Sequence, residues 1–588
     1  MKRVLLSNPY GPYDLEWGEN QFDILESRLQ RGQGPFTLKS YSHCFALYLI
    51  AENIHARTTV MEHPHLEDYE EELRKGYDYL GIQVISITIG KVARMIRMAR
   101  EIAPQTKIVI GGYGVLALDD PPPGETTGDA ETILAETDHL CREEGVRFMR
   151  KLLGDEPVDR PITQLYLPRG ASFFPGADDY AERSMGTMLV ALGCPNGCEF
   201  CCTSAMFKKQ KIYISTPEET FETMKHFCRR NGGRATAVSL LDENLLLNEG
   251  YVRKLGKLIQ EDQEFGLRKL SYFSFGDLRA MSRFSMEELL ELGVDSIWVG
   301  MESSFNDVIT SDHKIEKRAC DDVKSAFRAM EQHGIGITAS MVLGWDFHTP
   351  DNIEEDIDYF VDIGPSAYQL TFLTACPGTE LYDRMKKAGR INSTLTFHDI
   401  QQCNDGTFIP KHFALGELRQ YFDRAHEKLY EKNGPGLFRS FQINLNGYET
   451  CSRSARPLLR EQKALLFAER CQSSYPMLAA VGRFAPSETV REKVREAEEK
   501  YHRLLGPPTE AQEMQSKGFC ELVARRVEEL KKPRSDDPVD PEFRRVYYDP
   551  QVGPIPMIKR GRGPGEPVPY RVFDDPGPAS AAAASSGC

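Results

Sequence analysis

The sequence has little cysteine, and what it has is unevenly placed. Only 14 of its 588 residues are cysteine, yet four of these stand in the stretch GCPNGCEFCC at 193–202. No apolar run approaches the ~18–20 residues that cross a bilayer, which argues against a transmembrane helix. The start, MKRVLLSNPYGPYD, has only a short apolar run and is typical of a first strand rather than a signal peptide. We therefore expect a cytoplasmic protein, in which clustered thiols favour metal binding over disulfides.

Basic charge is also in short supply. The chain has 72 Lys and Arg residues against 87 Asp and Glu residues, a net charge of −15. This balance argues against broad nucleic-acid binding. A hydrophobic content of 41% and a charged content of 27% are those of a soluble globular protein. Because single cores stop growing near ~250–300 residues, the length predicts several domains.

The first domain, residues 1–150, alternates strands and helices. Apolar strands at KRVLLSNP, YLGIQVISITI and TKIVIGGYG, with helical spacing at 90–103, predict a doubly wound, Rossmann-like parallel sheet in an α/β fold. Ligands of such sheets bind beyond the carboxyl ends of the strands. The candidate binding residues there are Asn8, Ser86, Thr88, Gly111, Gly112 and Tyr113. No GxGxxG follows the first strand, so a dinucleotide site is weakly indicated, and the two glycines could simply form a tight turn.

The rest of the chain divides by composition. Residues 151–183 carry Pro and Gly with little periodicity and are predicted to be a linker. In 184–389, six strand–helix units, with strands GTMLVALG, TAVSLLD, KLSYFSF, DSIWVGME, ITASMVLG and AYQLTFL, predict a partial (βα)6 barrel. Residues 390–530 predict a helical C-terminal region. Residues 531–588, rich in Pro, Gly and charge, predict a disordered tail.

Cys194, Cys198 and Cys201 follow the first barrel strand with the spacing CxxxCxxC. Barrels of this kind place their chemistry at the carboxyl ends of the strands. Three thiolates cannot close a four-ligand zinc site alone, but they suit a [4Fe–4S] cluster with one iron left open. A zinc site with a distant fourth ligand and unligated thiols are the alternatives. Cys202 directly follows the third thiol on an extended loop, and we interpret it as a non-ligand.

The stretch CPNGCEFC resembles the signature CxxxCxΦC of the radical S-adenosylmethionine (SAM) superfamily, with Phe200 as the aromatic residue. The resemblance implies that the open iron chelates SAM. One electron, from a reductant such as flavodoxin or ferredoxin, then cleaves SAM to methionine and a 5′-deoxyadenosyl radical. That radical takes a hydrogen atom from a substrate, so the cofactors carry the chemistry and the protein positions and shields them.

Other strand ends are similar to SAM-binding segments of this superfamily. Asp242-Glu243-Asn244 stands where a Gly-Gly-Glu-like stretch usually meets the SAM amino group, although the glycines are missing here. The stretch GMES at 300–303 resembles G-x-E-S, which approaches the SAM ribose and carboxylate; a structural salt bridge is the alternative for its glutamate. The stretch at 374–379 resembles a P-G-T segment, or is a Pro-Gly turn. The implied SAM-binding residues are Phe200, Asp242, Glu243, Gly300, Glu302, Ser303 and Ser340.

The N-terminal domain resembles that of the cobalamin (B12)-binding subgroup, often called class B. The resemblance rests on IVIGGYG and on HLCREEGVRFMRKLLG at 139–154, which is similar to a segment near D-x-x-x-x-G-E-G-E. It implies that the six strand-end residues of the first domain bind cobalamin. Two departures stand out: Glu143-Glu144-Gly145 replaces Gly-Glu-Gly, and the DxHxxG motif that supplies a lower histidine to cobalt is absent. A vestigial domain that binds nothing is the alternative.

The resemblance implies a methyltransferase that acts on an unactivated carbon of a small molecule, lipid or peptide. One SAM methylates cob(I)alamin, a second yields the radical, and the substrate radical takes methyl from methylcobalamin. Ring formation, ring contraction or carbon coupling without net methyl transfer is the first alternative, and a cobalamin-binding sensor is the second. RNA methylthiolation needs a second cysteine triad upstream, and only Cys44 and Cys141 precede Cys194. The sequence identifies no catalytic side chain.

Overall fold

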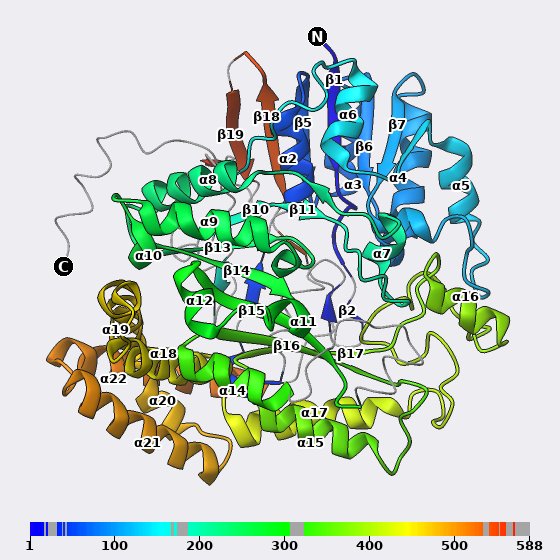
Figure 1. Cartoon of the computed structure of the whole chain (residues 1–588). Helices are drawn as coiled ribbons and strands as arrows, with labels where there is room; N and C mark the ends of the chain where they lie inside the picture. The colour runs from blue at the N-terminus through cyan, green and yellow to red at the C-terminus, as the bar shows by residue number, and fades with distance from the viewer. Residues whose placement is uncertain are drawn as a thin grey trace.

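The computed structural model describes most of the chain. It covers residues 1–13, 32–37, 44–165, 186–305, 323–532, 540–541 and 543–551, with strand backbone at 15–16, 19–20, 39–41, 170–172, 553–559 and 568–570. Figure 1 shows an N-terminal sheet with its helices lying beside a second sheet, and a group of C-terminal helices packed against the second. The predicted α/β fold with a helical C-terminal region is confirmed.

The N-terminal sheet contains eight strands in the order β20-β19-β18-β5-β1-β6-β7-β8. Five of them are parallel: β1 (Arg3–Ser7), β5 (Arg57–Glu62), β6 (Tyr79–Gln83), β7 (Lys107–Gly111) and β8 (His139–Cys141). Helices α2 (Phe45–Asn53), α3 (Leu66–Leu73), α4 (Ile89–Ile102), α5 (Asp129–Glu136) and α6 (Gly145–Leu153) connect and cover them. The predicted doubly wound sheet is therefore present. The sequence missed β5, whose run RTTVME includes two threonines, and β8, which has only three residues.

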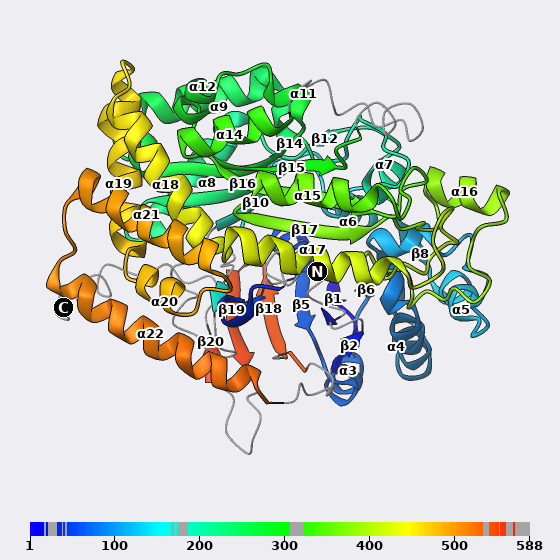
Figure 2. The same ribbon diagram turned by 90° about the horizontal axis from the view of Figure 1, so that it is seen from below.

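The prediction of a disordered tail is wrong for the part that the structure describes. Strand β18 (Arg544–Asp549) pairs antiparallel with β5, and β19 (Gly553–Lys559) and β20 (Val568–Tyr570) extend the same sheet, as Figure 2 shows. The short alternating run RRVYYD is flanked by Pro- and Gly-rich stretches, so composition hides it. The tail residues at 533–539, 542, 552, 560–567 and 571–588 lie outside the described residues.

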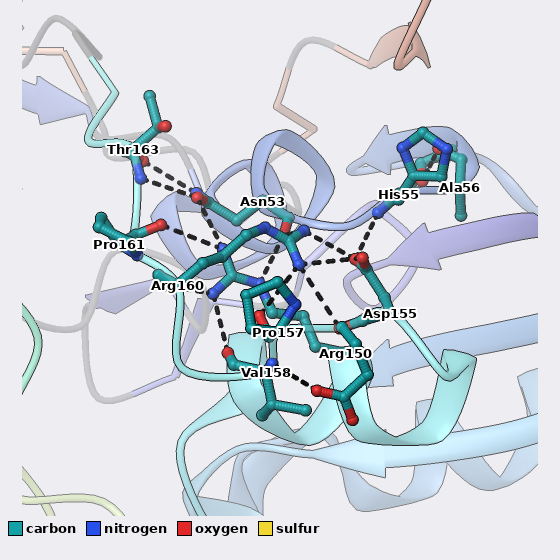
Figure 3. Close-up of polar contacts among 12 residues, drawn as sticks. Asn53, His55, Ala56, Arg150, Asp155, Pro157, Val158, Arg160, Pro161 and Thr163 are labelled. Carbon is teal, nitrogen blue, oxygen red and sulfur yellow. Dashed lines mark hydrogen bonds and ion pairs between the residues drawn. The ribbon is translucent and has the colours of Figure 1, made fainter.

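The first part of the predicted linker is held to the N-terminal domain by a buried arginine (Figure 3). Arg150 of α6 is 1% exposed, and its Nε donates to the backbone oxygen of Asn53 at 2.9 Å. Its Nη1 donates to the backbone oxygens of Val158 and Arg160 at 3.0 and 2.7 Å. Arg160 in turn pairs with Asp155 at 2.8 Å. The linker residues at 166–169 and 173–183 lie outside the described residues.

The second sheet has six parallel strands, and they are the six that the sequence predicts. In spatial order they are β10 (Gly186–Leu189), β13 (Thr236–Leu241), β14 (Leu270–Gly276), β15 (Val294–Glu302), β16 (Gly336–Leu343) and β17 (Ala367–Phe372). Helices α8 (Pro217–Arg230), α9 (Glu249–Glu261), α12 (Met286–Glu291), α14 (Val323–His333) and α15 (Ile353–Ile363) cover its outer face. The sequence also predicts a helix at 317–333, of which 317–322 lie outside the described residues and α14 covers the remainder. The partial barrel is confirmed.

The C-terminal region is helical, as predicted. Its helices are α17 (Leu418–Asn433), α18 (Gly436–Ser452), α19 (Ala464–Ser474), α20 (Met477–Arg483), α21 (Glu488–Leu505) and α22 (Glu510–Leu530), with a π-helical turn at Leu459–Lys463. The sequence missed α18 and α20. Figure 2 shows these helices along one flank of the barrel, with α18 next to α19. Among the described helices, none is both long and apolar enough to cross a membrane.

Candidate active site

The three predicted cluster thiols lie on one tightly folded loop. Strands β11 (Ala191–Leu192) and β12 (Ile212–Tyr213) pair antiparallel and close the loop, which also contains helix α7 (Cys202–Met206). Cys194 and Cys198 are 6% and 4% exposed, and Cys201 is half-buried. Gly193 has a φ of +84°, and a Cβ there would lie 2.0 Å from the backbone oxygen of Gln210. Only glycine fits there, so the sequence itself specifies this curl.

The donor set of the loop fits an iron–sulfur cluster. All three candidate ligands are thiols, the group that holds such clusters. In a [4Fe–4S] cluster each thiolate binds a different iron, so the sulfur atoms do not meet at one ion. Within the described part of the chain, no three His, Cys, Asp or Glu side chains gather closely enough to hold a single metal ion.

Cys202 directly follows the third candidate ligand, and its thiol contacts a cysteine outside the loop. A hydrogen bond with the Cys376 thiol raises the pKa of Cys202 well above its usual value, and burial raises it further. Cys376 follows β17, in the segment that resembles P-G-T. The interpretation of Cys202 as a non-ligand stays a prediction, and this contact gives its side chain another role in packing.

The buried carboxylate of Glu199 fixes the cysteine loop to the helix that follows the last barrel strand. Glu199, between the second and third thiols, is 6% exposed. Arg384 of helix α16 (Glu380–Lys387) donates two hydrogen bonds to it, from Nε to Oε2 at 3.1 Å and from Nη2 to Oε1 at 2.8 Å. Arg384 also donates to Asp346 at 3.2 Å, and the backbone nitrogen of Leu381 donates to the backbone oxygen of Glu199 at 2.9 Å. The loop is therefore clamped independently of any cofactor.

Two buried acids follow β13 beside this loop. Asp242 Oδ1 accepts from Lys211 Nζ at 2.5 Å and from the backbone nitrogen of Asn244 at 2.7 Å. Asp242 Oδ2 and Glu243 Oε2 are buried and have no hydrogen-bond partner among the described residues. Burial raises the pKa of both carboxyl groups, and the charge of Asp242 adds to the effect at Glu243. Unsatisfied buried acceptors are costly, so these oxygens fit a bound cationic group such as the SAM ammonium.

A hydrogen-bond network ties these acids to the cysteine loop. Asp277 follows β14, and its Oδ2 accepts from Asn196 Nδ2 of the loop at 2.8 Å and from Asn244 Nδ2 at 2.6 Å. The sequence did not single out Lys211 or Asp277. Each is a single charged residue outside any motif. Its contacts with the site exist only because the folded strands end beside it.

Glu302 adopts a backbone conformation that is unusual for its residue type. Its φ is +61°, and the pairing of β15 with β16 shifts register between Gly300 and Glu302. A non-glycine residue in the left-handed region is strained, and such strain gathers at functional sites. Trp345 Nε1 donates to the backbone oxygen of Glu302 at 3.4 Å, and its ring meets Phe200 edge-on at 5.7 Å. The fold thus joins two of the predicted SAM-binding residues, Phe200 and Glu302, through one tryptophan.

The Glu302 turn is anchored by Asp356, which is buried and hydrogen-bonded to His348. Asp356 of α15 accepts from the backbone nitrogen of Ser304 at 2.5 Å. Its other oxygen lies 2.9 Å from His348 Nε2, and both side chains are fully buried. The His348 ring lowers the pKa of Asp356, although burial alone would raise it. Of the remaining predicted SAM-binding residues, Ser303 is fully buried in this turn, and Gly300 pairs in register with Ser340.

A cavity of about 440 Å³ lies where the two domains meet. The N-terminal domain contributes strand-end residues, and the barrel contributes Leu189, Leu192 and Leu241. Asn8 and Thr88 line it, as predicted for a ligand site, together with His63, Gln83 and Glu144. Ser86, Gly111, Gly112 and Tyr113 are not part of its wall. Its volume is in the range of small-molecule sites.

The positions of Gly112 and Tyr113 have a structural explanation. Gly112 has a φ of +111°, and a Cβ there would lie 2.5 Å from the backbone oxygen of Val84. The next residue, Tyr113, reaches across to the barrel. Its hydroxyl lies 3.1 Å from Thr203 Oγ1 in α7, and its ring meets Phe207 edge-on at 6.4 Å. The third predicted strand end thus contacts the cysteine loop of the barrel.

His63 faces the cavity and was not predicted from the sequence, because it follows β5 without the DxHxxG motif. The backbone nitrogen of His63 donates to Asn8 Oδ1 at 2.7 Å, and Asn8 Nδ2 lies 2.9 Å from His63 Nδ1. The first bond fixes the orientation of the amide, so Nδ2 donates to Nδ1. The neutral imidazole therefore carries its proton on Nε2. This arrangement leaves no lone pair on Nε2 for a metal.

Comparisons with known proteins match parts of this chain. Residues 188–360 match the radical SAM superfamily. The bacteriochlorophyllide d C-12(1)-methyltransferase of Chlorobaculum tepidum is 24% identical over 381 residues, which cover 62% of this chain and 78% of that protein. The hopanoid C-2 methylase of Rhodopseudomonas palustris is 22% identical over 245 residues, 41% of this chain and 45% of that protein. A structure of the radical SAM methyltransferase TsrM from Kitasatospora setae, with tryptophan and a SAM analog bound, aligns with a TM-score of 0.48 and 13% identity, covering 80% of this chain and 100% of that one.

Proposed function

The chain is an enzyme of the radical SAM superfamily, in the subgroup that joins a cobalamin-binding-like domain to the barrel, and we propose that it methylates an unactivated carbon. The two relatives described above are named as a methyltransferase and a methylase. We extend that reaction class to this chain. The substrate is a small molecule, lipid or peptide in the cytoplasm, and a reductant of the flavodoxin or ferredoxin type provides the electron.

One observation supports the proposal above all others: the domain-junction cavity reaches the residue that precedes the cysteine loop. Leu192, which immediately precedes the loop, lines the cavity, and so do Asn8 and Thr88 of the N-terminal domain. Outside the cavity wall, the Tyr113–Thr203 contact also joins the N-terminal domain to the cysteine loop. A reaction that uses two cofactors in turn needs both to face one space, which this junction provides.

The residues around the site have roles that follow from their contacts. Cys194, Cys198 and Cys201 would hold the cluster, and the free carboxylate oxygens of Asp242 and Glu243 would accept hydrogen bonds from the SAM ammonium. Glu302 and Ser303, in the strained turn, would meet the rest of SAM. When bound, the cluster and SAM supply a 5′-deoxyadenosyl radical, and cobalamin supplies a methyl carrier. Leucine side chains from the barrel wall of the cavity exclude water.

The proposal is tested by following the two products of SAM separately. Protein purified anaerobically and reconstituted with iron and sulfide is incubated with SAM, a reductant and added cob(I)alamin. We expect 5′-deoxyadenosine, and also S-adenosylhomocysteine whose release depends on the cob(I)alamin. Release of 5′-deoxyadenosine with no S-adenosylhomocysteine would overturn methyl transfer and favour ring formation or coupling.

A further inference from the structure

The inner face of the barrel sheet has an unusual surface. Successive strand residues alternate between faces. Val238, Val299 and Ala339 belong to the core beneath the helices, so their sequence neighbours point inward. Inward-pointing Phe273, Phe275, Ser296 and Ser340 are partly exposed, whereas the outward residues are buried. Among the described residues, this inner face is therefore less completely covered than the outer face.

Three aromatic side chains form a shelf on this face. Phe275 and Trp298 are register partners on β14 and β15, and their rings stack at 5.1 Å with an interplanar angle of 23°. Phe273 meets both rings edge-on, at 5.3 Å from Phe275 and 6.5 Å from Trp298. Barrel interiors are more often filled by branched aliphatic residues. We call these three residues the aromatic shelf.

Unpartnered polar groups surround the aromatic shelf. Thr187 and Ser239 are register partners on β10 and β13, and Ser239 is in turn the partner of Phe273. On the other side, Gly300 of β15 is the register partner of Ser340 on β16, and Ser340 is the partner of Gln369 on β17. Thr187 Oγ1, Ser239 Oγ and Gln369 Nε2 are all buried without a hydrogen-bond partner among the described residues. Buried polar groups of this kind are normally satisfied, so they indicate a ligand with its own donors and acceptors.

The same face carries almost no charge. Its inward positions on the six described strands are Thr187, Leu189, Ala237, Ser239, Leu241, Ser271, Phe273, Phe275, Ser296, Trp298, Gly300, Glu302, Gly336, Thr338, Ser340, Val342, Ala367, Gln369 and Thr371. Of these described positions only Glu302, at the carboxyl edge, is ionisable. Burying an unpaired charge against such a wall would be costly.

Resting on the proposed function, we propose that the methyl acceptor presents an uncharged, planar unsaturated ring that stacks on the aromatic shelf. Offset or edge-on contacts with Phe275 and Trp298 orient the ring plane. A carbonyl or hydroxyl on that ring pairs with Gln369 or with the hydroxyls of β10 and β13. Trp298 lies four residues before Glu302, roughly 13 Å along the strand, so the ring sits below the edge that holds the SAM candidates.

The test uses three probes that differ in one property each. Benzamide is planar and neutral, cyclohexanecarboxamide is neutral but not planar, and benzoate is planar but charged. Their dissociation constants are measured by calorimetry on the reconstituted full chain with SAM present. The variants are Phe275→Leu, which removes one ring and keeps an apolar side chain, and Tyr213→Leu as its control. Tyr213 is 41% exposed, stacks on Tyr251 and lies outside the inner face.

We expect benzamide to bind at least about tenfold more tightly than either other probe, and Phe275→Leu to abolish this preference while Tyr213→Leu keeps it. Equal binding of the cyclohexane probe, preference for the carboxylate, an unchanged Phe275→Leu variant or no binding would each overturn the inference. Iron content and melting temperature check that the variants fold. The wild-type SAM products are measured separately, so a failure of the proposed methyl transfer is recognised on its own.

Discussion

At the scale of single residues, the site depends on side chains held in costly states. Glu302 keeps a left-handed backbone, and Asp242 and Glu243 each keep one buried oxygen without a hydrogen-bond partner among the described residues. Neighbouring hydrogen bonds hold these residues in place. Asp356, for example, accepts from the backbone nitrogen of Ser304 in the Glu302 turn. A ligand that satisfies these groups stabilises the folded state, because it binds the native form alone.

The histidine in the cavity gives a prediction about cobalt. Because Asn8 donates to His63 Nδ1, the ring proton sits on Nε2, and we expect no histidine nitrogen on cobalt when cobalamin is bound. The measurement is the electron paramagnetic resonance spectrum of bound cob(II)alamin, recorded with unlabelled protein and with ¹⁵N-histidine. The two spectra should be the same. A change of nitrogen splitting on labelling would show that His63 ligates the metal.

Lys463 gives a prediction about stability and pH. It is 1% exposed in the π-helical turn, and burial lowers its pKa to about 8, with Asp295 partly opposing the effect. The unfolded chain holds this proton up to its ordinary pKa near 10.5, so the cost of burying the charge is full below pH 8 and fades as pH rises from about 8 to 10.5. Lys463→Met should therefore stabilise the protein by about 2–3 kcal/mol at pH 7. Urea unfolding at pH 7 and pH 9.5 checks it: the gain must shrink at the higher pH, and a constant gain would contradict the assignment.

At the scale of elements, the barrel strands could be predicted and the sheet edges could not. The six barrel strands are apolar runs bounded by turn residues, so local pattern is enough to find them. Strand β5 contains threonines and β18 sits among prolines and glycines, and both become strands through pairing with distant partners. The three thiols could be found because they are adjacent in sequence. Lys211, Asp277, Arg384 and His63 could not, because only the folded chain brings them together.

The pairing of β18 gives a prediction at this scale. Arg545 is 7% exposed, and its Nε lies 3.1 Å from the fully buried carboxylate of Glu72. Arg545→Met should cost about 2 kcal/mol, less than a lone buried pair because Lys75 also pairs with Glu72 at 2.8 Å. Arg57 makes an exposed ion pair with Asp549 of the same strand, so Arg57→Met, the control, should change stability by less than ~0.5 kcal/mol. Equal effects in urea unfolding would show that β18 is not docked as described.

The pair of hydrogen bonds between Arg384 and Glu199, which clamps the cysteine loop, gives another prediction at this scale. Arg384→Met leaves the Glu199 carboxylate buried without its two hydrogen bonds, which should loosen the loop. We expect faster loss of iron to a chelator from this variant, by about tenfold, with the thiols all intact. Lys386 lies on the same helix as Arg384 and makes an exposed ion pair with Asp120. Lys386→Met is therefore the control. If both variants lose iron at the wild-type rate, the clamp does not support the cluster.

At the scale of the whole molecule, the two domains meet with their strand ends facing one junction. The cavity wall takes residues from both domains, and Tyr113 contacts the helix that follows the third thiol. Strand β18 extends the N-terminal sheet although it lies more than 480 residues from β5 in sequence, as the Arg544–Glu62 pair shows. Residues near both ends of the chain therefore belong to this sheet.

The central claim is that the loop at 193–202 holds an iron–sulfur cluster through three of its four cysteines, and the most direct measurement is metal per chain. Protein reconstituted anaerobically should bind about four irons, Cys194→Ala less than about one, and Cys202→Ser about four. Cys202 is the matched control, because it is in the same loop and its thiol instead contacts Cys376. Full iron in Cys194→Ala, or about one zinc and no iron in the wild type, would contradict the account.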